Sequence, residues 1–228
     1  MTDAKLLALL HLCDSLFPTG GYAHSDGLEA AVADSRVKTA VDLDCWLDAS
    51  LRESFGSCDG LAVVYAMQAV ADARWEDVRA LDEEIHALRP SSTARAATRH
   101  MGRRLLRTWM GTYPDSSEPF AAATRSLEAT LPVAFGIVCA SIGITSRAAV
   151  EAFAYTRLAA TMSCAMRLLP IGQHEAHAKL ATALARVPPL ALDIERRADR
   201  GDRPGMFAPG LDLAAMSQRH VHSRLFLS

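Results

Sequence analysis

Apolar residues recur at spacings of three and four along most of this chain, and this period limits the folds that it can adopt. The spacing is clear in Trp75, Val78, Leu81, Ile85 and Leu88. Such a stripe, with acidic residues between its members, is typical of an amphipathic helix. The β-branched and aromatic residues that fill strands are sparse, and they nowhere alternate with polar residues over six positions. We therefore predict an all-α fold.

The same spacing predicts a single compact domain of about eight to ten helices over residues 1–228, because proline and glycine interrupt it at intervals. Half of the residues are hydrophobic, which gives one domain of this length enough apolar material for a sizeable core. Asp26 and Glu29 are expected to cap the second helix. Residues 131–144 are too short to span a bilayer and are expected to form a buried helix. The expected helices cover residues 4–16, 26–33, 40–55, 59–72, 75–88, 92–111, 119–143, 146–168, 173–187 and 190–198.

A stretch rich in glycine and proline precedes the last part of the chain. Residues 199–210, DRGDRPGMFAPG, contain three glycines and two prolines, which predicts a flexible loop. We call residues 211–228, which follow this loop, the tail. Its apolar Leu225 and Phe226 follow Arg224, and aromatic residues and arginine are what the energetic hot spots of interfaces favour, so we expect the tail to bind a partner protein. The alternative is that the tail packs on the chain's own core.

Charge and cysteine content argue against several classes of protein. The formal net charge of -2 gives no overall attraction to nucleic acid or to an anionic membrane. The five cysteines are widely spaced and include no C-x-x-C pair, unlike a disulfide framework or a zinc ribbon. The first thirty residues carry Asp3, Asp14 and Asp26 and lack the pattern of a signal peptide. We therefore expect a cytoplasmic protein without nucleic-acid or membrane partners.

One run of residues near the start of the chain matches a family signature. Asp14 to Glu29 reads DSLFPTGGYAHSDGLE and resembles the signature D-S-x-x-P-x-G-[GS]-[FY]-x-H-S-x-G-L-E of the urease accessory proteins UreF. The chain departs from the family at Val221, since an acidic residue usually follows the histidine there. Three later blocks resemble the family in the same order: LPVAFG at 131–136, RLLPIGQ at 167–173 and HVHSRLFLS at 220–228.

The resemblance implies an all-α homodimer that forms a complex with UreD, also called UreH, and with the nickel-carrying GTPase UreG. Together these proteins insert nickel into apo-urease. In that scheme a UreF-like chain is not an enzyme but an adaptor, which holds UreG and UreD together and modulates GTP hydrolysis. The resemblance also makes the turn after Pro18 a presented surface, whose side chains either pack or face a partner. The residues expected to bind partners are Tyr22, His24, Ser25, His220, Arg224, Leu225 and Phe226.

No catalytic or cofactor-binding motif can be identified. Gly20 and Gly21 lack the lysine and the preceding strand of a phosphate-binding loop, so they are expected to permit a tight turn. His24, Ser25 and Asp26 are adjacent and do not fit a catalytic triad, and the chain has no G-x-S-x-G motif. An all-helical enzyme remains the alternative. It would require inward-facing polar groups with perturbed pKa values around one pocket.

Two pairs of histidines have spacings that occur among metal ligands. His174 and His177 lie three residues apart, and His220 and His222 lie two apart. No cysteine motif completes either pair, so we expect no nickel site in this chain. The alternative is a metallochaperone that binds nickel directly, which would require a high-affinity site.

Four arginines form a ridge along one expected helix. Arg95, Arg99, Arg103 and Arg107 follow one another at intervals of four residues. Such a ridge could dock an acidic UreG surface or place an arginine at its phosphoryl-transfer site. We favour a solvated helix face that pairs with the acidic residues between 76 and 84 across a helical hairpin.

Overall fold

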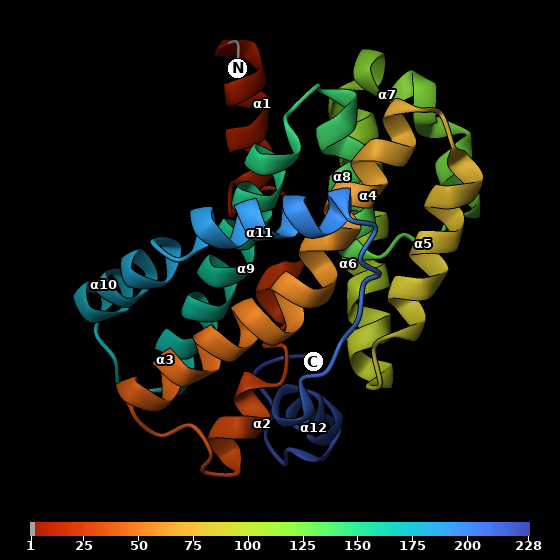
Figure 1. Ribbon diagram of the computed structural model, residues 1–228. Coiled ribbons are helices and arrows are strands. Elements are labelled where there is room, and N and C mark those ends of the chain that lie inside the picture. Colours follow the sequence, from red (N-terminus) through yellow and green to blue (C-terminus); the bar gives the residue numbers. More distant parts are fainter. Residues whose placement is uncertain (1–2) are drawn as a thin grey trace.

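The computed structural model describes residues 3–228, and Figure 1 shows that they form one body of packed helices. No strand occurs among these residues, so the predicted all-α fold is confirmed. The α-helices are α1 (Asp3–Cys13), α2 (Leu28–Ala33), α3 (Ala40–Ala49), α4 (Gly60–Ala71), α5 (Trp75–Ala87), α6 (Ser92–Thr112), α7 (Pro114–Ala121), α8 (Leu131–Ser141), α9 (Ser146–Leu168), α10 (Gln173–Leu184), α11 (Val187–Asp199) and α12 (Pro209–Ser217). A π-helix, Ser50–Asp59, and the 3₁₀ helices Gly21–Ala23, Ala123–Ser126 and Gln218–His220 accompany them.

Helix α8 lies at the centre of the core. Its residues from Leu131 to Cys139 are all buried, and α4, α6 and α9 pack around it. Gly136 allows α4 to approach closely, since a Cβ atom at this position would lie 2.8 Å from the carbonyl oxygen of Val63. The predicted buried helix is therefore confirmed. No helix within residues 3–228 is both long enough and apolar enough to span a bilayer.

The expected helix over residues 119–143 is two helices, α7 and α8. The break is caused by Asp82 of α5, whose fully buried carboxylate accepts the backbone N–H groups of Ala129 and Thr130 at 2.7 and 2.8 Å. Ala129 has φ 58° and leaves the helical path. Pro132 then stands in the first turn of α8, where proline is well tolerated.

Two other helix boundaries differ from expectation for local reasons. Residues 40–71 run as one continuous helical rod, because the π-helix joins α3 to α4 without a break. Pro188 and Pro189 were expected to interrupt the helical pattern, but they form the first turn of α11. The tail, expected as a short terminal stretch, begins within the helix α12.

The stretch 199–210 connects α11 to α12 across the π-helix. The N–H of Gly205 donates to the carbonyl oxygen of Ser57 at 3.0 Å. The Tyr65 hydroxyl donates to the carbonyl oxygen of Asp202 at 2.7 Å. This path brings α12 against α2 and the first turn of α6, at the lower end of the view in Figure 1. The tail is thereby placed beside the family-like run 14–29.

Candidate functional site: the turn and the tail

Glu29, on the first turn of α2, lies at the centre of the contact between the tail and the rest of the molecule. Its carboxylate accepts the backbone N–H groups of Leu225 and Phe226, at 2.5 and 3.3 Å, and the side-chain amide of Gln218. The side-chain oxygen of Gln218 in turn accepts the N–H of Ala30 at 3.1 Å. Glu29 is only 4% exposed and Gln218 is fully buried, so water competes little with these bonds.

A second set of hydrogen bonds joins Ser228 to the turn, which we define as residues 18–25. The backbone N–H and the hydroxyl of Ser25 both donate to the carbonyl oxygen of Ser228, at 2.5 and 2.8 Å. The Nδ1 atom of His24 lies 2.6 Å from the Ser228 hydroxyl. The N–H of Leu227 donates to the carbonyl oxygen of Ala23 at 2.8 Å. The end of the tail therefore pairs with the turn along their backbones.

We call the hydrogen bonds that His24, Ser25 and Glu29 make with the tail the clasp. Burial is the main cause that lowers the pKa of the His24 imidazole from its ordinary value. The ring is therefore neutral at pH 7, and one of its nitrogens can accept a hydrogen bond while the other donates one. The clasp thus joins a neutral ring, a hydroxyl and a carboxylate to backbone and side-chain groups of the tail.

A cationic side chain holds the aromatic residues of the turn and the tail together. The guanidinium carbon of Arg167, on α9, lies 4.3 Å from the centre of the Phe226 ring and 5.0 Å from that of Tyr22. Both distances fall within the range of cation–π interactions. Phe226 is 2% exposed, whereas Tyr22 is 68% exposed, so this stack runs from the interior to the surface.

The seven residues that the sequence predicts for partner binding fall into two groups. Three are buried in contacts within the chain: His24, Ser25 and Phe226. Four are exposed: Tyr22, His220, Arg224 and Leu225. Sequence reasoning missed Glu29, Gln218 and Arg167 as residues that position the tail. Glu29 and Arg167 stand in the family-like blocks, but their roles depend on contacts with residues far away in the sequence.

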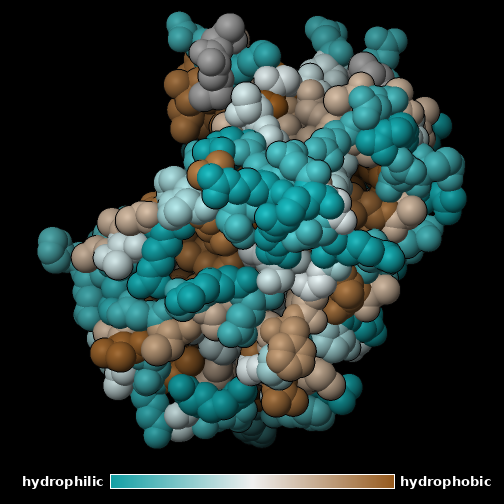
Figure 2. Space-filling view, viewed as in Figure 1, coloured by the Kyte–Doolittle hydropathy of each residue, from teal (hydrophilic) through white to brown (hydrophobic). Residues whose placement is uncertain are grey.

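Large apolar side chains on the tail face outward. We define the tail apolar surface as Leu213, Met216, Leu225 and Leu227, whose exposed fractions are 59%, 44%, 58% and 67%. Brown and tan spheres lie over the lower part of the molecule in Figure 2, where α12 lies in Figure 1. Exposed apolar side chains that gather in one region are typical of an interaction site.

The predicted capping pair of Asp26 and Glu29 is wrong. The N-cap residue of α2 is Gly27, with φ 86° and no side-chain cap, and the Asp26 carboxylate pairs with Arg157. Glu29 binds the tail instead. Gly27 also permits a close approach of α12, since a Cβ atom there would lie 2.6 Å from the backbone nitrogen of Ala215. The residues that resemble a helix cap in sequence therefore form the contact between the start of α2 and the tail.

A cavity of 130 Å³ lies between α12, the π-helix, α6 and α9. Asp59 and Arg89 line it and form an ion pair at 2.7 Å, with each side chain 10% exposed. Asp26 and Arg157 line it as a second pair. Burial raises the pKa of Asp212, on α12, which also lines the cavity. An all-helical enzyme would have to act here, although most of the charges are already matched in pairs.

The thiols and histidines were the other candidates for chemistry. Burial raises the pKa of the Cys13, Cys58 and Cys164 thiols to about 12, so they are protonated and poorly nucleophilic at neutral pH. His174 and His177 are exposed on the first two turns of α10. Within residues 3–228, no group of three or more His, Cys, Asp or Glu side chains converges as a metal site would require.

The expected pairing of the arginine ridge with the acidic residues between 76 and 84 is wrong. Arg99 instead pairs with Glu128 at 2.7 Å, and Arg103 lies 3.8 Å from the same carboxylate. The reason is that the exposed or partly exposed carboxylates of α5 already have other partners, two arginines at helical spacing and one from the stretch 199–210, so they are not available to α6. Their partners are Arg74, Arg79 and Arg203.

Comparisons with known proteins agree with this arrangement of motifs. The sequence model of the UreF family matches residues 37–184. The chain is 31% identical over 225 residues to the urease accessory protein UreF of Rhodopseudomonas palustris (strain BisA53), covering 99% of this chain and 94% of the relative. It is 31% identical over 228 residues to the protein of the same name from Methylorubrum populi (strain ATCC BAA-705 / NCIMB 13946 / BJ001), covering 100% of both chains.

A third relative, the urease accessory protein UreF of Paenarthrobacter aurescens (strain TC1), is 29% identical over 238 residues and covers 100% of both chains. The match of the family model lies between the turn and the tail and includes neither of them. The whole-length similarity to these relatives extends over both, so the two segments that form the clasp belong to the shared sequence.

Proposed function

The chain belongs to the UreF family of urease accessory proteins, and on this premise we propose that it is a non-enzymatic adaptor for nickel insertion into apo-urease. In this proposal a homodimer binds UreD and the GTPase UreG together and modulates GTP hydrolysis by UreG. The observation that carries the proposal is the tail apolar surface, which the clasp fixes in place beside Tyr22.

The tail apolar surface is assigned to UreD. Leu225 and Leu227 alternate with the buried Phe226, so the backbone that presents them is anchored between them. A surface that is already ordered loses less conformational entropy on binding than a flexible segment does. Exposed leucine side chains of this kind gain by burial against a partner. These features support a preformed docking surface.

The second copy of the chain is assigned to a groove between α1 and α9. This groove has a volume of 830 Å³, and leucines of α1 and small residues of α9 line it. Leu6 and Leu7 lie on the same helix and are 41% and 66% exposed. A homodimer uses the same patch on both copies, and small side chains such as Ala159 and Ala160 would let helices approach closely. Light scattering of Leu7→Asp against the unchanged protein tests this assignment.

Several observations support a role without catalysis. The relatives that span the whole chain are named as accessory proteins rather than as ureases. The charges in the cavity are largely paired, and three buried or partly buried thiols have a raised pKa. In this proposal the chain organises its partners, and nickel and nucleotide are bound by them.

Co-purification with UreD and UreG from the same organism tests the adaptor role. Replacing Leu225 and Leu227 by aspartate should remove UreD binding, because each lost apolar contact at a hot spot weakens a complex by about 2 kcal/mol, or about thirtyfold. Circular dichroism should remain unchanged, since both side chains are exposed. Val41→Asp is the matched control, because Val41 is 69% exposed on α3, away from the tail. Failure of the unchanged protein to bind UreD and UreG would refute the proposal.

Measurements on the isolated protein address the two alternatives. The purified chain should hydrolyse neither GTP nor ATP and should retain little nickel after gel filtration. Stoichiometric, submicromolar nickel binding that is lost when His174 and His177 are changed would instead establish a metallochaperone. Turnover of any substrate that is abolished by Asp212→Asn, with the fold intact, would establish an enzyme.

A further inference from the structure

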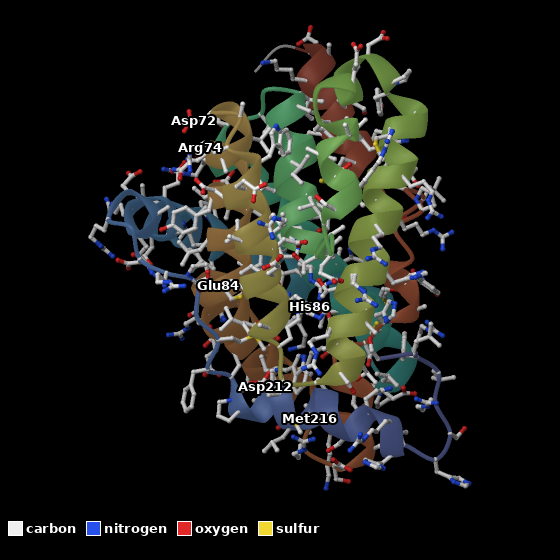
Figure 3. The ribbon with its side chains drawn as sticks, turned by 90° about the vertical axis from the view of Figure 1, so that its right-hand side faces the viewer. Asp72, Arg74, Glu84, His86, Asp212 and Met216 are labelled. Atoms are coloured by element: carbon white, nitrogen blue, oxygen red, sulfur yellow. The ribbon has the colours of Figure 1, made fainter. Side chains whose placement is uncertain are left out.

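The outward side of α6 carries an unbalanced positive charge. The sequence of α6 contains five arginines and one histidine but no aspartate or glutamate. We define the α6 basic face as Arg99, His100, Arg103, Arg104 and Arg107, which are exposed or partly exposed along the middle of the helix and beyond. Side chains that end in nitrogen atoms project from the outer side of α6 in Figure 3.

Few ion pairs form on this face. The ion pairs that it forms within residues 3–228 all end on one carboxylate, that of Glu128, at 2.7 Å from Arg99 and 3.8 Å from Arg103. One carboxylate cannot neutralise four guanidinium groups. The ridge residue Arg95 is held apart from the face, because it donates to the backbone carbonyl oxygens of Arg89 and Pro90 at 2.6 and 3.0 Å.

The neighbouring helix α5 shows the arrangement that an ordinary exposed helix uses. There Arg79 pairs with Glu76 and Glu83 at spacings of three and four, so opposite charges alternate along the surface. On α6 the same spacings bring Arg99, Arg103 and Arg107 together. Like charges at this spacing repel one another and destabilise a helix. The α6 basic face therefore weakens the fold slightly, which indicates that its charges serve an interaction.

We infer that the α6 basic face binds an acidic surface of a second partner protein while the tail holds the first. This inference rests on the proposed function, and within it the second partner is UreG. The two surfaces lie apart, since α12 packs on the first turn of α6, where Ser91 and Thr93 donate to the carbonyl oxygen of Ala215 at 3.1 and 3.3 Å. The basic face begins two turns later at Arg99, so both partners have room.

The chemistry of the face favours a protein partner over nucleic acid. The face carries no Phe, Tyr or Trp side chain on which bases could stack, and the chain as a whole has a net charge of -2. It also carries no apolar side chain, unlike the tail apolar surface. The contact should therefore depend on charge, form rapidly and weaken as salt is added.

Replacing Arg103 and Arg107 by glutamine tests the inference in the complex with UreD. We expect the affinity for UreG to fall about tenfold at physiological salt, its salt dependence to diminish, and UreD binding to remain unchanged. The thermal midpoint of the variant should be unchanged or higher, because repulsion along the helix is relieved. Lys38→Gln with Arg196→Gln is the matched control, since it removes the same charge from exposed positions outside α6.

Each other outcome overturns the inference in a distinguishable way. Unchanged UreG affinity in the Arg103 and Arg107 variant, while the unchanged protein still recruits UreG, would refute the basic face and leave the adaptor role intact. A clear fall in the thermal midpoint would make the face structural. Tight binding of a labelled RNA or DNA duplex that is lost in the variant would make it a nucleic-acid surface. Failure of the unchanged protein to recruit UreG would refute the proposed function and this inference together.

Discussion

Replacing Glu29 by glutamine should release the tail while leaving the helical core folded. The Glu29 carboxylate accepts three N–H groups, from Leu225, Phe226 and Gln218. A glutamine side chain has one oxygen acceptor and one amino group, and the amino group would face an N–H donor. At least one buried donor of the tail therefore loses its partner, and the remaining bonds lose the contribution of the charge.

The size of the effect follows from the bonds that are lost. A hydrogen bond to a charged group contributes about 1.5–3 kcal/mol, and a buried donor without a partner costs about 1–3 kcal/mol. We therefore expect the docking of the tail to weaken by about 2–4 kcal/mol, which corresponds to an increase of about 30-fold to 1000-fold in the detached population. The core around α8 does not depend on Glu29, so its protection should change much less.

Native-state hydrogen exchange measured by mass spectrometry resolves the two regions. Peptides that cover residues 221–228 should exchange faster in Glu29→Gln, whereas those from α8 should keep their protection. Glu175→Gln is the control, because Glu175 is exposed on α10 and forms no ion pair within residues 3–228. Equal exchange of the tail in the unchanged protein, the control and Glu29→Gln would show that the clasp does not hold the tail.

Three further predictions follow from the turn and the tail. Gly20→Val should lower the free energy of unfolding by about 1 kcal/mol or more, because Gly20 has φ 83°, which a β-branched residue adopts only with strain. Gly21→Ala should change the free energy of unfolding little. Equal melting temperatures of these two variants would contradict the prediction. Asp212→Asn should stabilise the protein at pH 7, because burial raises the pKa of Asp212 and so disfavours its ionised form in the folded state. The stabilisation should disappear in acid, where Asp212 is protonated in the folded and unfolded states alike. Denaturant titrations that show the same difference in stability at every pH would contradict this prediction. The protection of the tail, measured relative to the intrinsic exchange rate at each pH, should fall as the pH drops below about 6.5, because burial lowers the pKa of His24 and the docked tail disfavours the charged ring. A His24→Gln variant with the same pH dependence of protection would assign the effect elsewhere.

Local patterns in the sequence predicted most of the helices. The apolar spacing in α5 and the continuous apolar run of α8 are properties of neighbouring residues, so they can be identified without knowing the fold. The family-like run 14–29 likewise stood out as a unit. What it does inside the molecule could not be predicted from that run alone.

The features that were missed depend on residues far apart in the sequence. Asp82 breaks the expected helix before α8 by accepting the backbone N–H groups of Ala129 and Thr130. Glu29 meets the tail across nearly the whole length of the chain. Its spacing from Asp26 fits a capping pair, but the tail offers its carboxylate three donors in a buried place. Three charge-assisted bonds outweigh one exposed capping bond, so the distant contact determines the structure.

Within the proposed function, the clasp and the tail apolar surface are coupled through the docked state of the tail, and this coupling determines how far Glu29→Gln should affect UreD binding. If UreD binds only the docked tail, its apparent dissociation constant equals the intrinsic value divided by the docked fraction. If the docking free energy of the tail greatly exceeds the part that Glu29→Gln removes, the tail stays almost fully docked in the variant. The affinity for UreD then barely changes, even though hydrogen exchange of the tail becomes faster. A weakly docked tail loses affinity in proportion to the detached fraction. Measuring exchange and affinity on the same variant therefore gives the docking free energy. A loss of affinity larger than the exchange data allow would show that Glu29 acts on UreD by another route.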